Sequence, residues 1–312
     1  MSASGGTKAI VAALFANLGI AVTKFIAAFF SGSASMLAEG VHSLADSANQ
    51  VLLLVGGKRA RRAPTAEHPF GYGRSRYVYA FIVAIILFSV GGVFSLYEGV
   101  EKLTHPHPLE IPWLPVLVLV IAIILESFSL RTAVRESNHV RGDQSWVQFV
   151  RRAKAPELPV VLLEDIAALL GLVFALVGVS LAWITGDVVW DGIGTIMIGV
   201  LLIAVAVVLG LEMGSLLVGE GATSADMTRI TAAITAGPEV DRIIHAKTLY
   251  LGPDELLVAA KVSMAAGTPL AEITQRIDAV ESRIREAVPV ARVIYLEPAV
   301  YQPASAEVDA RA

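Results

Sequence analysis

The stretch SASMLAEGVHSLADSANQ, residues 33–50, places ionisable side chains inside a segment long enough to cross a lipid bilayer. Glu39, His42 and Asp46 are spaced three and four residues apart. At about 100° per residue, these steps bring all three side chains to one face of a helix. Ionisable groups within a membrane span are costly and usually functional. The stretch therefore predicts a membrane helix with one polar face that has a functional role.

Apolar stretches of similar length recur along the first two thirds of the chain. The 312 residues are 55% hydrophobic and 17% charged, whereas soluble domains have about 45–50% apolar and about 25% charged residues. Six stretches come close to or exceed the roughly 20 residues that cross a bilayer: 9–30, 34–57, 77–100, 113–134, 158–184 and 190–218. We therefore predict an α-helical membrane protein with six transmembrane helices.

Composition also excludes several classes of function. The chain has no cysteine, so it can form neither a thiolate metal site nor a disulfide. Its net charge of −4 gives no sign of nucleic-acid binding. An intramembrane metallohydrolase is disfavoured because neither an HExxH motif nor a Ser/Lys pair is present, so we do not expect an enzyme.

Basic residues in the loops predict the orientation. Lysines and arginines gather after the second and the fourth apolar stretch, at Lys58–Arg76 and Arg131–Lys154. Cytoplasmic loops carry an excess of these residues, so both termini are expected in the cytoplasm. No signal or transit peptide is recognisable at the N-terminus, which favours a bacterial plasma (inner) membrane.

The composition changes after Gly221, where apolar runs become short. The pattern over 223–299 is helix, strand, strand, helix, strand, with GPDE at 252–255 as a hairpin signal. This order predicts a small α+β layer of the ferredoxin-like kind. We expect a transmembrane domain at 1–220, a cytoplasmic ferredoxin-like domain at 221–301 and a flexible tail at 302–312.

The polar face at Glu39–Asp46 has two interpretations. A histidine and a carboxylate at i and i+4 can hold one divalent ion, because their side chains meet one turn apart. Alternatively, the face is a hydrogen-bonded or water-filled stripe, which Asn49 and Gln50 continue toward the cytoplasm. The adjacent Glu164 and Asp165 within the fifth stretch favour metal binding, because a second helix then offers carboxylates suited to zinc or manganese.

Further polar residues lie within the apolar stretches. Lys24 is close to the outer end of the first stretch, so we expect its ammonium to snorkel to the interface. Glu126 is interpreted as a proton carrier, as a partner of a metal ligand or as a helix-packing hydrogen-bond group. Asp187 and Asp191 are expected to cap the helix of the sixth stretch.

The combined motifs resemble the cation diffusion facilitator family. They are GSASMLAEGVHSLADSANQ at 32–50 and HPFGYGRSRY at 68–77, together with six spans and a cytoplasmic domain. VVLLEDIAALLG at 160–171 and ITGDVVWDGIGT at 184–195 are similar to the subgroup of zinc transporter nine. The resemblance implies a homodimeric antiporter that exports Zn²⁺ or a related divalent ion from the cytosol in exchange for protons.

The resemblance also implies a tetrahedral transport site. By position, its ligands are His42 and Asp46 on the second span and Asp165 on the fifth. The fifth-span histidine of the family falls on Val161, which cannot bind a metal. The fourth ligand must then come from Glu164, Glu39, Glu126 or water, with Glu164 favoured and Glu39 next. An oxygen-rich site shifts preference toward Mn²⁺ or Fe²⁺.

Other metal sites of the family lack some of their ligands in this chain. In the loop after the second span, His68 matches a family metal ligand, but Tyr72 stands at another ligand position. Arg74 matches a residue that locks the family's dimer, with Glu220 as the nearest acidic partner. In the cytoplasmic domain His245 and Glu297 match family ligands.

Two positions of that domain depart from the family's pattern. Lys261 and Tyr295 replace two further histidines. Because a lysine ammonium can supply the charge that a metal would supply, we predict dimerisation without structural metal.

A metal sensor or scaffold that has lost transport is the alternative from another class of function.

Overall fold

The computed structural model of the protein describes residues 3–107 and 111–301. The chain divides into two compact units. One comprises Met1–Ala63 and Arg74–Leu217, and the other comprises Pro64–Gly73 and Val218–Ala312. The loop Pro64–Gly73, which links two long helices of the first unit, therefore belongs to the second unit. The tail predicted at 302–312 lies outside the described residues.

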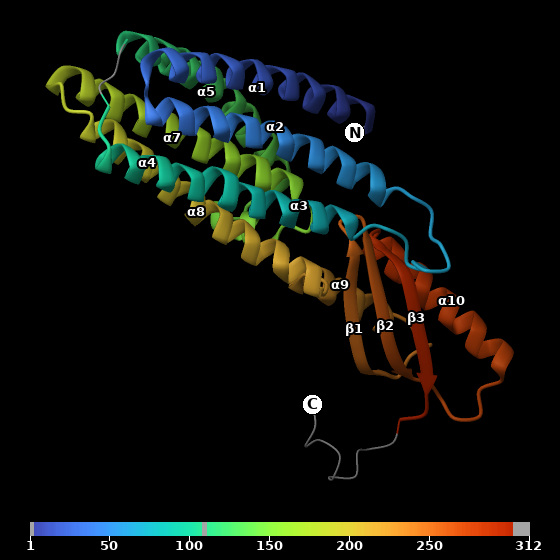
Figure 1. Ribbon diagram of the computed structural model, residues 1–312. Helices are drawn as coiled ribbons and strands as arrows, with labels where there is room; N and C mark the ends of the chain where they lie inside the picture. Colours follow the sequence, from blue (N-terminus) through green and yellow to red (C-terminus); the bar gives the residue numbers. More distant parts are fainter. Residues whose placement is uncertain (1–2, 108–110, 302–312) are drawn as a thin grey trace, which may run out of the picture. The chain divides into compact units, whose positions relative to one another are not determined.

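The first unit is a bundle of long helices (Figure 1). They are α1 (Ala3–Ser31), α2 (Ala34–Ala60), α3 (Ser75–Ile86), the π-helical η1 (Leu87–Val93), α4 (Phe94–Thr104), α5 (Trp113–Arg141), α6 (Trp146–Arg152), α7 (Glu157–Thr185) and α8 (Val189–Val218). The α3, η1 and α4 segments follow one another without a break and form one continuous helical rod.

Four helical segments within the described ranges are long and apolar enough to cross a membrane. They are Ser75–Thr104, Trp113–Arg141, Glu157–Thr185 and Val189–Val218. Among the described residues of α1, the apolar helix Asn17–Ser31 is shorter than these four. The 27 residues of α2 would rise about 40 Å, so this helix has the length of a span but an interrupted apolar surface. Membrane character is thus supported, and crossings by α1 and α2 stay a prediction.

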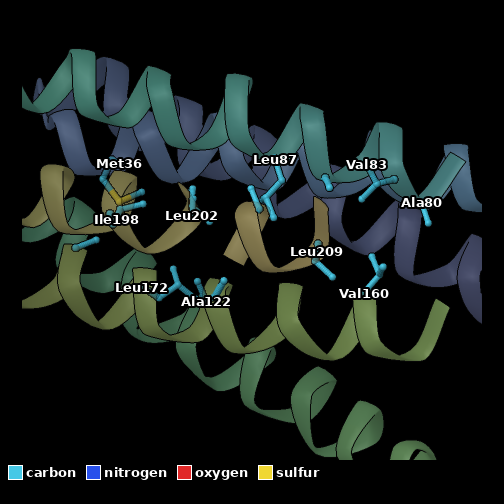
Figure 2. Close-up of a cluster of buried hydrophobic side chains, with 14 of the residues drawn as sticks. Met36, Ala80, Val83, Leu87, Ala122, Val160, Leu172, Ile198, Leu202 and Leu209 are labelled. Carbon is cyan, nitrogen blue, oxygen red and sulfur yellow. The ribbon is translucent and has the colours of Figure 1, made fainter. Parts of the chain in front are cut away.

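The core of the first unit is apolar and lies where the helices face one another (Figure 2). Met36 of α2, Leu87 of η1, Leu172 of α7 and the α8 pair Ile198 and Leu202 are all at most 1% exposed. Large apolar side chains also cover the outside of the bundle, where Phe29 is 84% and Ile184 is 79% exposed. Such extensive apolar exposure is typical of a surface that contacts lipid or another protein.

A seam of small residues joins the η1–α4 segment to α8. Each glycine of one helix accommodates an aliphatic side chain of the other, in four pairs: Gly92 with Ile203, Gly99 with Ile196, Gly192 with Leu103, and Gly199 with Leu96. A Cβ atom at Gly99 would lie 2.6 Å from Ile196 Cγ1, closer than packing allows. In both helices the glycines recur seven residues apart, and the pairing is antiparallel. We call these four pairs the glycine seam.

Asp191 caps a different helix from the one expected. Its Oδ2 accepts a hydrogen bond from the Ala34 N–H at 2.9 Å, and its Oδ1 accepts one from the Ser35 N–H at 3.2 Å. The carboxylate therefore satisfies free N–H groups at the start of α2. The prediction that Asp191 caps α8 is wrong, but the residue does lie in the first turn of α8, where its charge complements the positive helix end as predicted. Asp187 does cap α8, through the Val189 N–H at 3.1 Å.

The second unit is a three-stranded sheet with two helices. Its elements are α9 (Ser224–Thr235), β1 (Arg242–Gly252), β2 (Glu255–Ser263), α10 (Leu270–Ala287) and β3 (Ala291–Ala299). The strand order is β1-β2-β3, with β1 antiparallel and β3 parallel to β2. This is the order of elements that the sequence predicts, and the turn between β1 and β2 falls at GPDE.

The core of the second unit joins the helices to the sheet. Ile230 of α9, Val258 of β2, and Val280 and Ile284 of α10 are completely buried. The helical spacing of the apolar residues Leu270, Ile273, Ile277, Val280, Ile284 and Val288 predicts one apolar face on α10, and this face packs into the core over the middle and end of the helix. Leu270 departs from it and is 79% exposed, because it is the first residue of the helix.

The loop Pro64–Gly73 lies against the end of β1. A Cβ atom at Gly73 would lie 2.7 Å from the Leu251 carbonyl oxygen, and one at Gly252 would lie 2.9 Å from Gly73 Cα. The two backbones therefore approach each other so closely that only glycine fits at both positions.

Candidate metal centre

The polar face of α2 is buried within the helical unit. His42 Nε2 lies 3.6 Å from Asp46 Oδ2, and their side chains are 1% and 15% exposed. Neither ring nitrogen of His42 has a hydrogen-bond partner among the described residues. The same holds for Asp46 Oδ1. Buried polar atoms are normally satisfied. An imidazole and a carboxylate with unused lone pairs, one turn apart, are the donor atoms that a divalent cation requires.

The two carboxylates of α7 point toward different helices. Glu164 is buried and accepts a short hydrogen bond from the Asn49 side-chain amide of α2. Asp165 accepts a hydrogen bond from the Ser129 hydroxyl of α5 at 3.1 Å. Adjacent residues on a helix diverge by about 100°, so Glu164 faces α2 while Asp165 faces α5.

Val161 lies in an apolar cluster. It packs with Ala133 of α5, Phe149 of the short helix α6 and Leu162 of α7. The position at which the family has a histidine is therefore filled by an aliphatic contact. A fourth ligand has to come from another residue or from water.

The candidate ligands are near one another but are not assembled into a closed site. Among the residues that the structure describes, no three His, Asp or Glu side chains surround a point that would hold a metal ion. The carboxylates of Asp46, Glu164 and Asp165 lie within electrostatic range of one another. Hydrogen bonds to Asn49 and Ser129 hold the two α7 carboxylates apart, so a cation would have to exchange those bonds for its own.

Lys24 is buried, so the prediction that it snorkels to the interface is wrong. Its side chain is 3% exposed, and its Nζ donates to Glu39 Oε2 at 2.9 Å and to Ser43 Oγ at 2.8 Å. The turn at Gly32 folds α1 back along α2 and brings Lys24 opposite the polar face. One oxygen of Glu39, a candidate ligand, is therefore already bound by an ammonium group.

Glu39 is also enclosed from the side of α7. A Cβ atom at Gly171 would lie 2.7 Å from Glu39 Oε1. That oxygen is buried and accepts no hydrogen bond from the described residues. Glycine at position 171 thus makes the space that the carboxylate occupies between α1 and α7.

Glu126 lies on α5 and is partly buried. It is within electrostatic range of Asp165 and Asp46. This position suits a proton carrier or a partner of a metal ligand, and these two roles, like the role in helix packing, stay predictions. Asn49 donates a hydrogen bond to the candidate ligand Glu164, a contact that supports the prediction that it is a partner of a metal ligand.

A π-helical segment adjoins His42. Neither the motifs nor the periodicity of the sequence predicts this segment. A Cβ atom at Gly91 of η1 would lie 3.9 Å from His42 Nδ1. The π-helical geometry of Leu87–Val93 is of a kind that often occurs at functional sites. The two neighbouring glycines in this segment are the only local signal that would have marked it.

The loop after α2 gives little support for a second metal site. The rings of His68 and Tyr72 stack edge to face with centroids 4.6 Å apart. The His68 N–H donates to Thr65 Oγ1 at 3.2 Å. These contacts are those of a structural turn. Arg74 and Glu220 fall in different units, and their pairing stays a prediction.

His245, Lys261 and Glu297 form one row across the sheet of the second unit. His245 pairs with Lys261, and Lys261 pairs with Glu297, on neighbouring strands. Lys261 Nζ lies 2.6 Å from Glu297 Oε1. This hydrogen bond and the nearby positive charge hold the pKa of Glu297 below its ordinary value. The lysine thus engages the carboxylate that resembles a family ligand.

Comparison with known proteins finds relatives along most of the chain. Residues 10–218 match the family model of the cation efflux transmembrane domain. The chain is 32% identical over 265 residues to the proton-coupled zinc antiporter SLC30A9, mitochondrial, of Xenopus laevis, a match that covers 84% of this chain and 47% of that protein. It therefore spans about half the length of this relative.

Two further relatives come from a plant and a bacterium. The chain is 30% identical over 257 residues to metal tolerance protein C4 of Arabidopsis thaliana, covering 82% of this chain and 56% of that protein. It is 25% identical over 292 residues to the cation-efflux pump FieF of Pectobacterium atrosepticum, covering 92% and 91%. The similarity to the bacterial protein thus extends through both units.

Proposed function

This chain belongs to the cation efflux family, and from that premise we propose that it exports divalent metal cations, with Zn²⁺ first, in exchange for protons. The observation that carries the proposal is the buried His42–Asp46 pair, whose free lone pairs lie within electrostatic range of the α7 carboxylates. The names of relatives that describe a zinc antiporter and a cation-efflux pump support it.

The proposed transport site uses His42 and Asp46 of α2 with Asp165 of α7. Glu164 is the proposed fourth ligand, because its carboxylate already reaches α2 through Asn49. Glu39 is the next carboxylate on the same face. Zn²⁺ accepts a tetrahedral set of imidazole and carboxylate ligands.

Proton exchange follows from the chemistry of these ligands. A metal binds imidazole and carboxylate only in their deprotonated forms, so binding releases protons. An imidazole changes its charge between about pH 5 and 8, which makes His42 the proposed coupling residue. When the site opens to a more acidic exterior, protonation of His42 expels the ion and one or more protons return.

The proposed setting is a bacterial plasma membrane with both termini in the cytoplasm. Basic loop residues support that orientation. The second unit is then a cytoplasmic ferredoxin-like domain through which two copies form a homodimer. The Lys261–Glu297 pair supports dimerisation without structural metal.

Export of Mn²⁺ or Fe²⁺ is the second candidate. The apolar packing of Val161 favours it, because loss of the histidine leaves a site richer in oxygen. Parallel measurements with the three ions on one preparation separate the two candidates.

The test is uptake of Zn²⁺ into proteoliposomes under an imposed pH gradient. We expect gradient-driven flux for the wild type and for Asp143→Ala, an exposed residue of the α5–α6 connection that serves as the control. Asp165→Ala and Asp46→Ala should abolish the flux. Absence of wild-type flux for Zn²⁺, Mn²⁺ and Fe²⁺ alike would favour the non-transporting sensor or scaffold instead.

A further inference from the structure

A buried ion pair lies beside the proposed transport site and has no part in the mechanism above. Lys24 and Glu39 are 3% and 0% exposed, and Nζ and Oε2 are 2.9 Å apart. The ammonium has three N–H donors. Glu39 and Ser43, one turn apart on α2, accept two of them.

Glu39 would otherwise be well placed to bind the metal. It precedes His42 by three residues, so the two side chains share a face of α2 and are close enough to bind one ion. Its Oε1 has no hydrogen-bond partner among the described residues. The close backbone of Gly171 limits its movement toward α7, and Lys24 holds it from the side of α1.

The charges around the polar face of α2 also indicate a role for Lys24 beside Glu39. The acidic side chains around the polar face are Glu39, Asp46, Glu126, Glu164 and Asp165. Of the two lysines that are buried in the described helices, Lys102 donates to the Gly32 carbonyl, away from this cluster. Lys24 is therefore the lysine that offsets the negative charge of the polar face.

We propose that Lys24 acts as a fixed internal counter-ion that withholds Glu39 from the metal and thereby sets the ion selectivity of the site. With Glu39 engaged, the ligands are one imidazole and the carboxylates of Asp46 and α7. Without Lys24, a further hard oxygen would join them, and the preference would move from Zn²⁺ toward Mn²⁺. Lys24 is thus a specificity-determining residue, and this inference rests on the proposed function.

The test is a double-mutant cycle on the purified full chain, read as the affinity for Zn²⁺ and for Mn²⁺ in competition with a chelating dye. The variants are Lys24→Gln, Glu39→Gln and the double variant. Lys24→Gln releases the carboxylate, so the affinity for Mn²⁺ relative to Zn²⁺ should rise about tenfold. Glu39→Gln leaves an unpaired ammonium near the site, so the affinity for both ions should fall about tenfold.

The double variant decides between interpretations. Its two introduced glutamine side chains are neutral and can hydrogen-bond to each other, so both affinities should return to within about threefold of the wild type. If Glu39 were a ligand, the double variant would lose Zn²⁺ affinity as Glu39→Gln does, and the proposal would be overturned. A purely structural pair would weaken binding in both single variants, with no rise for Mn²⁺, and this result would also overturn it.

Two outcomes separate this inference from the proposed function. A wild type that binds neither ion overturns both. If the wild type binds Zn²⁺ but the double variant has an altered selectivity, only the role proposed for Lys24 is overturned, and the proposed function stands. If the unpaired carboxylate of Lys24→Gln prevents folding, the double variant beside the wild type still tests the proposal, because a double variant that loses Zn²⁺ affinity would show that Glu39 is a ligand and overturn it.

Discussion

Glu164 is the residue on which the composition of the metal site most depends, because Val161 cannot supply a ligand. We expect Glu164→Gln to lower the affinity for Zn²⁺ by at least about tenfold, since an amide replaces an anionic ligand of similar size. Equilibrium competition with a chelating dye measures this change. Glu136→Gln, at an exposed position of α5, is the matched control. Unaltered affinity in Glu164→Gln would contradict the assignment and move the fourth ligand to Glu39 or Glu126.

At the scale of single residues, sequence reasoning succeeds where the information is local. His42 and Asp46 come together because one helical turn separates them, and that spacing is visible in the sequence. The expectation for Lys24 is wrong because it infers the depth of the side chain from its distance to the end of α1. Its partner Glu39 is fifteen residues away, across the turn at Gly32. The register of α1 against α2 depends on packing along both helices, which no short motif encodes.

The glycine seam is the feature that can be tested at the scale of secondary-structure elements. Gly199→Val would place a side chain 2.8 Å from Leu96 Cγ. Overpacking of this kind costs about 1–3 kcal/mol, so the thermal unfolding temperature of the purified protein should fall by several degrees. Gly210→Val, in the same helix, is the control, because nothing lies within 4 Å of its Cβ position. Equal shifts in the two variants would refute a packing role for the seam.

A second prediction at this scale concerns the clamp between α9 and α10. Arg283 Nη1 and Nη2 donate to Glu239 at 3.1 and 2.9 Å, and its Nε donates to the Ala233 carbonyl. The hydrogen bonds lower the pKa of Glu239 below its ordinary 4.5. The pair therefore stabilises the fold above that ordinary value, and the stabilisation is lost as the pH falls through the lowered pKa.

We accordingly expect Arg283→Met to destabilise the second unit by about 1 kcal/mol at pH 7, and by less at pH 4. Hydrogen exchange of the α10 amides in the full chain, corrected for intrinsic rates, measures both values. Arg292→Met, on an exposed position of β3, should change exchange little. A loss that is the same at both pH values would show that the charge of Glu239 is not involved.

The elements themselves are predictable to different degrees. The α9–β1–β2–α10–β3 order follows from period, turn residues and caps, all of which are local. Leu270 fits the helical period of the buried face, yet as the first residue of α10 it is largely exposed. The π-helical η1 lies where its glycines contact His42 of α2 and Ile203 of α8, residues that are distant in the sequence. Such tertiary causes leave no periodic trace in the sequence.

For the whole molecule, the orientation in the membrane is open to a direct test, because the chain has no cysteine. A single cysteine at Asp143, in the connection after α5, should react with a membrane-impermeant maleimide only after cells are permeabilised. A cysteine at His105, after α4, should react in intact cells. The opposite pattern would reverse the orientation inferred from the basic loops.

The number of crossings shows where whole-molecule reasoning from sequence meets its limit. The sequence predicts six, whereas four helices within the described part of the chain are long and apolar enough to cross a membrane. In α2, polar residues such as Glu39 and Asn49 belong to the candidate metal centre. The same residues lower the apolar character of the helix. A helix shielded from lipid by its neighbours can carry such residues, but that shielding is a property of the assembled bundle and not of the segment.

The glycine seam has a consequence for motion. Its glycines recur at seven-residue intervals in both helices, and each receives an aliphatic side chain from the opposite helix. Axial sliding or rotation would have to withdraw several side chains from these sites at once. We therefore expect η1–α4 and α8 to move as one rigid body during a transport cycle. Relative displacement would then occur at the contacts of α7 with α2 and with α5, where the Asn49–Glu164 and Ser129–Asp165 hydrogen bonds can exchange.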